Sequence, residues 1–286
     1  MRVIDSFAYG RRDNLDTSDP GVRVDQVKLC GGCADKLVEP LNGVDYLFHL
    51  AAEKHNQSID SPERVLDANV SGTYELLRAA ADAGVKKCVF TSSLYAYGKM
   101  AGPPMKEGDL PAPQTIYGIS KLAGEHLCRY FSLHRGLSTV CLRLFFVYGP
   151  RQYAGLGYKS VIVSNFERLL NGKKPFICGS GTQKLDYIHV DDVVSALVLA
   201  AASDISKAEV FNVGSGYGPS INELTERMMR VAGVVKDCEH GPADFTEGSS
   251  RVADTTKYTD HFGMRTSVAL EDGLRRTLEW IISSTR

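Results

Sequence analysis

The stretch that decides the fold runs from Asp45 to Ser93 and reads DYLFHLAAEKHNQSIDSPERVLDANVSGTYELLRAAADAGVKKCVFTSS. It begins and ends with short apolar runs, at 45–52 and 86–93, whose length and composition are typical of strands. Between them, residues 61–84 have a helical pattern, with a proline at a first-turn position and a glycine as the C-terminal stop. The stretch therefore predicts a strand, a helix and a second strand in succession.

The same alternation of strands and helices continues on both sides of this unit. It indicates a parallel sheet with helices on both faces, and the nearly all-apolar strands are typical of a sheet that is covered twice. The sequence thus predicts an α/β fold with a doubly wound parallel sheet. Further strands are expected at Arg2–Asp5, Leu137–Leu144 and Glu209–Gly214, and further helices at Tyr117–His134 and Ser267–Ser284.

The composition excludes several classes of protein. The 286 residues are 43% hydrophobic, which is enough for a proper core. The formal net charge of -1 gives no electrostatic basis for binding nucleic acid or an anionic membrane surface. No apolar run approaches the roughly 20 residues of a membrane span, and the one at the N-terminus is too short for a secretory signal. We therefore expect a cytoplasmic protein.

The cysteines are interpreted as reduced thiols. There are seven of them, an odd number scattered through strand-like and helix-like segments. Cys30 and Cys33 have the spacing of half a zinc site or of a redox pair, but no second pair of ligands follows at a similar spacing. We interpret these two as structural and expect no metal.

Tyr117 and Lys121, in the segment QTIYGISKLAGEHL at 114–127, are candidate catalytic residues. They are four residues apart and share one face of a helix. A lysine ammonium beside a tyrosine stabilises the phenolate and lowers the pKa of the hydroxyl toward the range of a general base. Ser93 ends a strand and would reach the same crevice. Taken alone, however, a tyrosine and a lysine at this spacing are more often an ordinary surface pair.

Several motifs occur together and in one order. They are HLAAEKHNQSIDSP, NVSGT, FTSSLYAYG, YGISK, LRLFFVYGPRQ, GSGTQKLDYIHVDDV and FNVGSG. Together they resemble the extended short-chain dehydrogenase/reductase family, in its NAD-dependent sugar-nucleotide epimerase/dehydratase branch, from Arg2 to about Trp280. The resemblance implies a Rossmann-type sheet, NAD as cofactor, a nucleoside-diphosphate sugar as substrate and a homodimer.

The resemblance also implies roles for individual residues. Tyr117 would be the general base, Lys121 its electrostatic partner and ribose anchor, and Ser93 the hydroxyl that orients the substrate. Asp5 would bind the adenosine ribose, and a carboxylate there favours NAD, although the basic pair at 11–12 leaves NADP open. Cofactor-binding residues are expected at Asp5, Ala51, Lys54, Asn69, Tyr117 and Lys121, and substrate-binding residues at Ser93, Phe146 and Arg251.

Two domains are implied as well. The expected NAD-binding domain comprises 1–145 and 184–215, and the smaller C-terminal substrate-binding domain comprises 146–183 and 216–286. Two charged residues near these boundaries, Arg143 and Asp186, are interpreted as structural, in a buried ion pair or at a strand end.

The chain departs from the family at its start. In the family the strand at Arg2–Asp5 is the second one, and a first strand, a Gly-rich turn and a helix precede it. The glycines that let a pyrophosphate approach a helix N-terminus are absent from this sequence. We therefore expect an N-terminally truncated sheet with two unpaired edges, poor NAD binding, and a gene that encodes more than these residues.

Three ligand positions also depart from the family. Gly31-Gly32 stands where relatives carry Gly-Asp near the adenine, Leu185 where they carry arginine, and Phe146 where they carry asparagine. The arginine and asparagine normally hold the nucleotide diphosphate and the sugar. Arg251 would then serve the diphosphate, and the pocket should be more apolar than usual, as a deoxy or N-acetylated sugar would suit.

Leu94 and Tyr95 argue against one reaction. Relatives that dehydrate across C4–C6 carry Asp-Glu at these two places, so no acid is available here to protonate the leaving hydroxyl. We expect an epimerase, at C4, in which Tyr117 takes the proton of the 4-hydroxyl while hydride passes to NAD and returns. The alternatives are an NAD(P)-linked 4-ketosugar reductase, another sugar-nucleotide oxidoreductase, or a cofactor-deficient fragment that acts as a scaffold.

Overall fold

The computed structural model describes residues 1–98, 102–152, 159–263 and 265–284. The chain forms two compact units. The first comprises Met1–Met100, Gly108–Arg143 and Leu197–Phe211, and the second comprises Ala101–Glu107, Leu144–Ala196 and Asn212–Arg286. Residues 184–196 and 212–215, expected with the first unit, belong to the second by their contacts. The assignment of one unit to NAD and the other to substrate stays a prediction.

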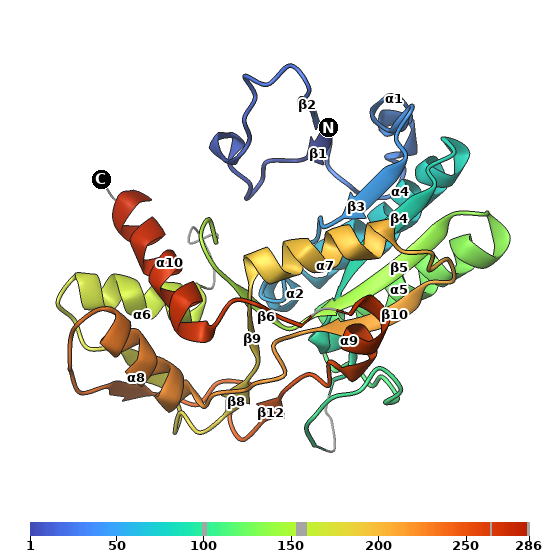
Figure 1. The fold of residues 1–286 in the computed structure, drawn as a ribbon. Coiled ribbons are helices and arrows are strands. Elements are labelled where there is room, and N and C mark those ends of the chain that lie inside the picture. The colour runs from blue at the N-terminus through green and yellow to red at the C-terminus, as the bar shows by residue number, and fades with distance from the viewer. Residues whose placement is uncertain (99–101, 153–158, 264, 285–286) are drawn as a thin grey trace. The chain divides into compact units, whose positions relative to one another are not determined.

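A four-stranded sheet forms the centre of the first unit (Figure 1). Its order is β10 (Glu209–Val213), β5 (Ser138–Leu144), β4 (Lys87–Ser93) and β3 (Tyr46–His49). The helices α4 (Gly72–Asp82) and α5 (Ile116–His134) pack on one face, around a core that includes Leu77, Phe90 and Phe131. The predicted strands and the helix α5 are present with ends that differ by no more than three residues, which confirms the α/β fold.

The helix predicted over 61–84 is interrupted. It forms as α3 (Pro62–Leu66), a π-helical turn η3 (Asp67–Ser71) and α4. Gly72 begins α4 against the loop that precedes the 3₁₀ helix η2 (Ala34–Lys36), and a Cβ atom there would lie 2.9 Å from the backbone of both Leu29 and Cys30. The glycine therefore lets this loop lie directly on the helix.

The first two strands are separate from this sheet. β1 (Arg2–Asp5) pairs in parallel with β2 (Arg23–Gln26) alone, and β3 is an edge strand of the four-stranded sheet. Within the described ranges no strand pairs with the other side of β1 or the outer edge of β3, as expected for a sheet without its central strand. The strands were expected to be covered on both faces of the sheet. This is correct for β4, which is buried throughout, and wrong for β3, where Tyr46 and Phe48 are exposed.

The second unit has its own core. Three helices contact one another there, α6 (Val161–Leu170), α8 (Ile221–Val231) and α10 (Leu270–Ser284). Parallel strand pairs complete it: β6 (Phe146–Tyr148) with β9 (Tyr187–His189), β7 (Phe176–Cys178) with β11 (Glu239–Gly241), and β8 (Lys184–Leu185) with β12 (Ser250–Arg251). α7 (Val190–Ala202) runs from this unit into the first, and the short helices are η1 (Arg12–Asn14), α1 (Val38–Leu41), α2 (Gln57–Asp60), η4 (Leu94–Ala96) and α9 (Thr256–Phe262). In the part of the chain that the structure describes, no helix combines the length and the apolar character needed to cross a bilayer.

Candidate active site

Ser93 and Tyr117 meet where β4 ends and α5 begins. Ser93 is the last residue of β4, and its hydroxyl accepts a hydrogen bond from the amide of Tyr95 at 3.3 Å. Thr115 caps α5 by accepting the amide of Gly118 at 3.0 Å, which places Tyr117 in the first turn. The side chain of Ser93 lies close enough to the Tyr117 hydroxyl to lower its pKa. The structure thus brings together two of the three predicted catalytic residues.

Lys121 lies one turn further along α5. Its Nζ atom is 5.8 Å from the centre of the Tyr117 ring and donates a hydrogen bond to the carbonyl oxygen of Thr91 at 2.8 Å. The side chain is buried, and this burial lowers the pKa of Lys121 to about 8. The ammonium is therefore close to the tyrosine, and its charge is lost only as the pH rises through about 8.

The expected lowering of the Tyr117 pKa is not found. Burial raises the pKa of the Tyr117 hydroxyl to about 12, and the side chain of Ser93 acts in the opposite direction without offsetting it. The prediction considered only the charge of Lys121, whereas the loss of water around the phenolate is the larger effect. Tyr117 is therefore a protonated hydroxyl at neutral pH.

Two aromatic side chains that the sequence analysis missed flank Tyr117. The ring of Tyr95 meets it edge-on, with centroids 5.6 Å apart, and the imidazole of His55 does so at 6.2 Å. Tyr95 and His55 also pack on each other, at 4.6 Å. Both follow the carboxyl ends of adjacent strands, β4 and β3, and that position was the signal available in the sequence.

Asn69, expected beside the cofactor, is buried and bonded to the protein. Its Oδ1 accepts the amide of Glu53 at 2.7 Å, and its Nδ2 donates to the carbonyl of Glu53 at 3.0 Å and to the hydroxyl of Ser120 at 3.1 Å. It thereby links the loop after β3 to α5. Its contact with cofactor stays a prediction.

Arg143 makes the buried ion pair that was expected. It donates from Nε and Nη2 to the two carboxylate oxygens of Glu125, each at 2.8 Å, and both side chains are buried. Glu125 also accepts a hydrogen bond from Ser92, which precedes Ser93. The structural interpretation of Arg143 is confirmed, and the pair ties α5 to strands β4 and β5.

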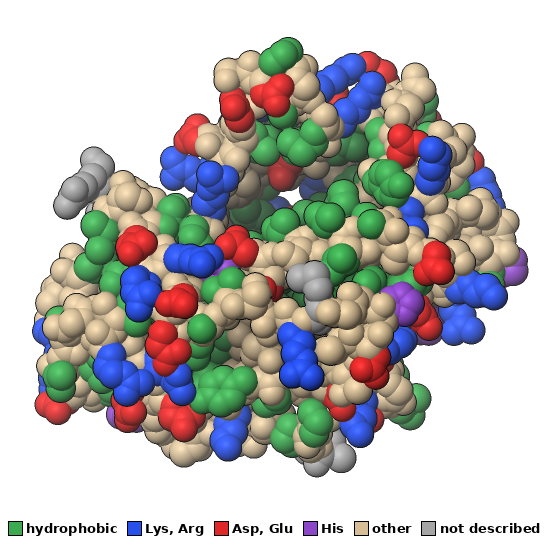
Figure 2. Space-filling model, viewed as in Figure 1, with side chains coloured by type: hydrophobic (Ala, Val, Ile, Leu, Met, Phe, Trp, Pro, Cys, Tyr) green, Lys and Arg blue, Asp and Glu red, His purple; other side chains and the backbone are tan. Residues whose placement is uncertain are grey.

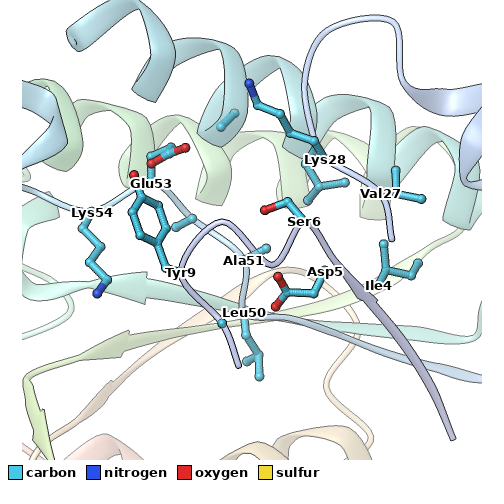
Figure 3. Close-up of a pocket in the computed structure, with 14 residues that line it drawn as sticks. Ile4, Asp5, Ser6, Tyr9, Val27, Lys28, Leu50, Ala51, Glu53 and Lys54 are labelled. Atoms are coloured by element: carbon cyan, nitrogen blue, oxygen red, sulfur yellow. The ribbon is translucent and has the colours of Figure 1, made fainter. Parts of the chain in front are cut away.

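A cavity of about 230 Å³ lies at the carboxyl ends of β1 and β3 (Figure 3). Asp5, Ala51 and Lys54, all predicted to bind the cofactor, are among its lining residues. Figure 3 shows the Asp5 carboxylate pointing toward Leu50 and Ala51, with Lys54 on the far side of Tyr9. Burial lowers the pKa of Lys54. The cavity therefore combines a carboxylate and a cation, as a nucleotide site requires.

The geometry around Asp5 suits an adenosine ribose. One carboxylate oxygen accepts the amide of Phe7 at 2.6 Å, which fixes the orientation of the side chain. A Cβ atom on Gly10 would lie 3.2 Å from the other oxygen, so the glycine leaves this oxygen approachable. A carboxylate held in this way accepts hydrogen bonds from a pair of ribose hydroxyls.

The basic pair that follows β1 is bonded to other groups. Arg12 donates to the side chain of Gln26 at 2.9 Å, and its guanidinium lies 4.3 Å from the centre of the Phe7 ring. Arg11 pairs with Asp13 at 3.0 Å. Neither arginine lines the cavity, so the side chains next to Asp5 favour NAD over a cofactor with a 2′-phosphate.

The sequence-predicted residues of the second unit lie in and around its paired strands. Phe146 packs against Tyr187 with ring centroids 5.6 Å apart, and Arg251 in β12 is in register with Leu185 in β8. Leu185 is buried, so an apolar side chain occupies the position where arginine was expected. Asp186 is fully buried and accepts hydrogen bonds from Ser215, Gly216 and Ala253, which supports its structural interpretation.

Cys30 and Cys33 are free thiols, as are the other cysteines. The amide of Cys30 donates to the sulfur of Cys33 at 3.5 Å, and Cys33 belongs to the core of the first unit. Burial raises the pKa of the Cys33 thiol, which disfavours the reactive thiolate. These contacts give the pair a packing role.

Comparison with known proteins agrees with this geometry. The model of the NAD dependent epimerase/dehydratase family matches residues 3–214. The UDP-glucose 4-epimerase of Mycolicibacterium smegmatis is 33% identical, over 97% of this chain and 89% of the relative. The solved UDP-glucose 4-epimerase of Thermotoga maritima, with UDP-glucose, has a TM-score of 0.91 at 31% identity, over 100% of this chain and 91% of that one.

Solved dehydratases are similar as well. The dTDP-glucose 4,6-dehydratase DesIV of Streptomyces venezuelae, a structure with NAD bound, has a TM-score of 0.90 at 28% identity, over 99% of this chain and 87% of that one. Overall similarity therefore does not separate epimerase from dehydratase, and the residues of the site must do so. What the match and the shared geometry do establish is that this chain belongs to the NAD dependent epimerase/dehydratase family.

Proposed function

We propose that this protein is an NAD-dependent epimerase of a nucleoside-diphosphate sugar that acts at C4 through a 4-keto intermediate. The observation that carries the proposal is the placement of Ser93 and Tyr117 together beside the buried Lys121, with no carboxylate at the two positions after Ser93. Leu94 is buried in the core and Tyr95 packs against aromatic rings. Neither can protonate a leaving hydroxyl as a carboxylic acid does, which disfavours a dehydratase.

The chain's own residues fit the cofactor. The cavity at the ends of β1 and β3 offers Asp5 to the adenosine ribose, with Ala51 and Lys54 alongside. When bound, NAD would supply the hydride acceptor and donor that interconversion of the two C4 epimers requires. Lys121 lies beside Tyr117 and would bind the nicotinamide ribose of NAD from there.

The proton of the sugar 4-hydroxyl would pass to Tyr117. Ser93 would hold that hydroxyl through its side-chain oxygen, which lies close to Tyr117. Because burial raises the Tyr117 pKa to about 12, the phenolate needs nearby positive charge, and Lys121 supplies one below about pH 8. Placement of these groups contributes most of the rate, as expected when a cofactor carries the redox chemistry.

The substrate we propose is a deoxy or N-acetylated sugar on a nucleoside diphosphate. Phe146 and the buried Leu185 replace two polar side chains expected in the second unit, which leaves fewer hydrogen-bonding partners for sugar hydroxyls. A structure of the UDP-N-acetylglucosamine 4-epimerase of Methanobrevibacter ruminantium, 30% identical with a TM-score of 0.91 over 99% of this chain and 90% of that one, lends support to this choice.

The test is a panel of UDP-, dTDP-, GDP- and CDP-sugars incubated with the protein and excess NAD, with products identified by proton NMR. We expect interconversion of 4-epimers with no net NADH, and UDP-N-acetylglucosamine converted at least as well as UDP-glucose. A strong preference for UDP-glucose would contradict the apolar pocket, which discriminates by only about 1–3 kcal/mol per methylene-sized difference. Net formation of NADH would indicate a sugar-nucleotide oxidoreductase, such as a 4-ketosugar reductase running in reverse, and no conversion of any sugar would favour a scaffold.

We also propose that the protein is a homodimer that associates through α4 and α5. Four large apolar side chains of these helices are exposed: Tyr74, Ile119, Tyr130 and Leu133. Apolar groups concentrated on neighbouring helices favour association with a second apolar surface. Light scattering should give twice the monomer mass, and the substitution Leu133→Glu should shift it toward the monomer, whereas a wild-type monomer would contradict the proposal.

A further inference from the structure

The first turn of α5 lies closer to the end of β4 than a side chain permits. Gly118 follows Tyr117 in this turn and is buried. A Cβ atom on Gly118 would lie 2.3 Å from the carbonyl oxygen of Tyr95 and 3.1 Å from the Cβ atom of Pro113. Non-bonded carbon atoms rest at about 3.5–4.0 Å from each other, and both distances are shorter than this. Either the turn or its surroundings would therefore have to move.

The surroundings are fixed by the chain on both sides. Tyr95 is held through its amide, which donates to Ser93, and both of its neighbours in sequence are buried. The segment that contains Pro113 is held by the amide of Ala112, which donates to the carbonyl of Tyr97 at 2.9 Å. A side chain at position 118 would therefore displace the turn of α5 rather than the residues that confine it.

We propose that Gly118 is a positioning residue that sets the separation between the Ser93 and Tyr117 hydroxyls. The absence of a side chain lets the turn that carries Tyr117 approach the segment 93–95 to within backbone contact. The inference rests on the proposed function for its kinetic readout. A displacement of about 1 Å can reduce an enzymatic rate about 10²-fold. A shift of that size, forced by one methyl group at position 118, is therefore enough to lower turnover.

The experiment compares three glycine-to-alanine variants. G118A adds the methyl group at the confined position, and G108A adds one where no atom lies within 4 Å. G273A is the matched control for strain alone, because Gly273 is also buried in a helix and its Cβ atom would lie 2.1 Å from the Tyr148 hydroxyl, in the second unit. For each variant kcat and KM are measured at saturating NAD, together with the midpoint of thermal unfolding.

G118A should lose kcat by about 10–100-fold while KM for the sugar nucleotide changes by less than about threefold. G108A should match the wild type, and G273A should unfold at a lower temperature with kcat unchanged. A wild-type kcat for G118A would overturn the proposal. So would an equal loss of kcat in G118A and G273A, since strain anywhere would then explain it.

Two further measurements separate positioning from general damage. In a Ser93→Ala background the additional effect of G118A on kcat should largely vanish, because the contact that it disturbs is already gone; additive effects would overturn the proposal. A crystal structure of G118A should show the Ser93 and Tyr117 hydroxyls farther apart than in a crystal structure of the wild type. An unchanged pair would overturn the proposal even if no sugar is turned over, so its failure is distinct from that of the proposed function.

A second variant covers the case in which G118A does not fold. Thr115→Ala removes the hydroxyl that accepts the Gly118 amide and loosens the same turn without adding atoms. We expect kcat to fall a few-fold with KM unchanged. A wild-type kcat in Thr115→Ala would then overturn the proposal.

Discussion

Two places at the carboxyl ends of strands in the first unit differ in how fully the protein encloses them. One is the end of β4, called here the completed end, and the other is the ends of β1 and β3, called here the open end. At the end of β4 every strand residue is buried, and Ser93 and Lys121 are each held by hydrogen bonds within the protein. At the ends of β1 and β3 the cavity is open between two unpaired strand edges, and Figure 2 shows hydrophobic side chains bordering the hollow below the N-terminal segment. The residues at the end of β4 are thus held in place by the protein, whereas the cavity lies beside strand edges with which no described strand pairs.

The largest effect is expected from Tyr117→Phe at the completed end. The variant removes one hydroxyl, so folding and nucleotide binding should stay near those of the wild type, while turnover falls by about 10²–10⁴-fold. Steady-state rates, far-UV circular dichroism and binding of the sugar nucleotide measure the three properties. Activity above about a tenth of the wild-type rate would exclude Tyr117 as the base.

The next effect concerns the open end. Residues 1–286 should bind NAD weakly, because the described lining of the cavity includes no glycine-rich turn leading into a helix N-terminus to hold the pyrophosphate. Fusing a strand, a Gly-rich turn and a helix of roughly 25–30 residues ahead of Met1 should raise the affinity to the micromolar range or tighter. Isothermal titration calorimetry measures both proteins.

The control for this fusion carries alanine in place of each glycine of the turn. It should pair with the strand edges, and therefore gain thermal stability, without gaining NAD affinity. Micromolar binding of NAD by residues 1–286 alone would show that the cavity is sufficient as it stands.

A smaller effect is expected from Asp5→Asn in the same cavity. The amide keeps the shape of the side chain but loses the charge that strengthens hydrogen bonds to ribose, a loss of about 1.5–3 kcal/mol, or roughly tenfold or more in affinity for NAD. Binding of NADP should weaken less, so the preference for NAD narrows. Equal loss for both cofactors would mean that Asp5 does not face the 2′ position.

The smallest effect is a bend in the pH–rate profile. Raising the pH increases the phenolate fraction of Tyr117, whose pKa is near 12, so the rate should first rise. Above about pH 8 Lys121 loses its proton and no longer favours the phenolate, so the rise should level off. Lys121→Arg keeps its charge and should show no bend there; the same bend in both proteins would assign it to another group.

The sequence predicted the completed end well, because its signals are local. An apolar run that stops at Ser93 and a capped helix that starts before Tyr117 define the ends of β4 and α5, and parallel strands present such ends on one side of the sheet. The sequence could not show that burial raises the pKa of Tyr117 by more than its neighbours lower it. Burial of the hydroxyl depends on Tyr95 and His55, which come from separate loops and meet only in the folded chain.

The open end was anticipated in outline and missed in detail. The absence of a glycine-rich turn predicted the unpaired edges of β1 and β3, but β2 was not recognised as a strand because only one of its four residues, Val24, is apolar. The motif that predicts Asn69 beside the cofactor could not show that its amide is bonded to Glu53 and Ser120, and its contact with the cofactor stays a prediction. Both features depend on contacts between segments distant in sequence.

The unpaired edge of β3 has a consequence for the protein in concentrated solution. This edge carries two exposed aromatic side chains, Tyr46 and Phe48, and no charged residue within the strand. Bare strands with aromatic side chains and no lysine or proline to block them are templates for pairing with another molecule. Copies of this protein should therefore tend to pair edge to edge and form insoluble aggregates during overexpression. A peptide that covers the edge of β3 should increase the solubility of the protein.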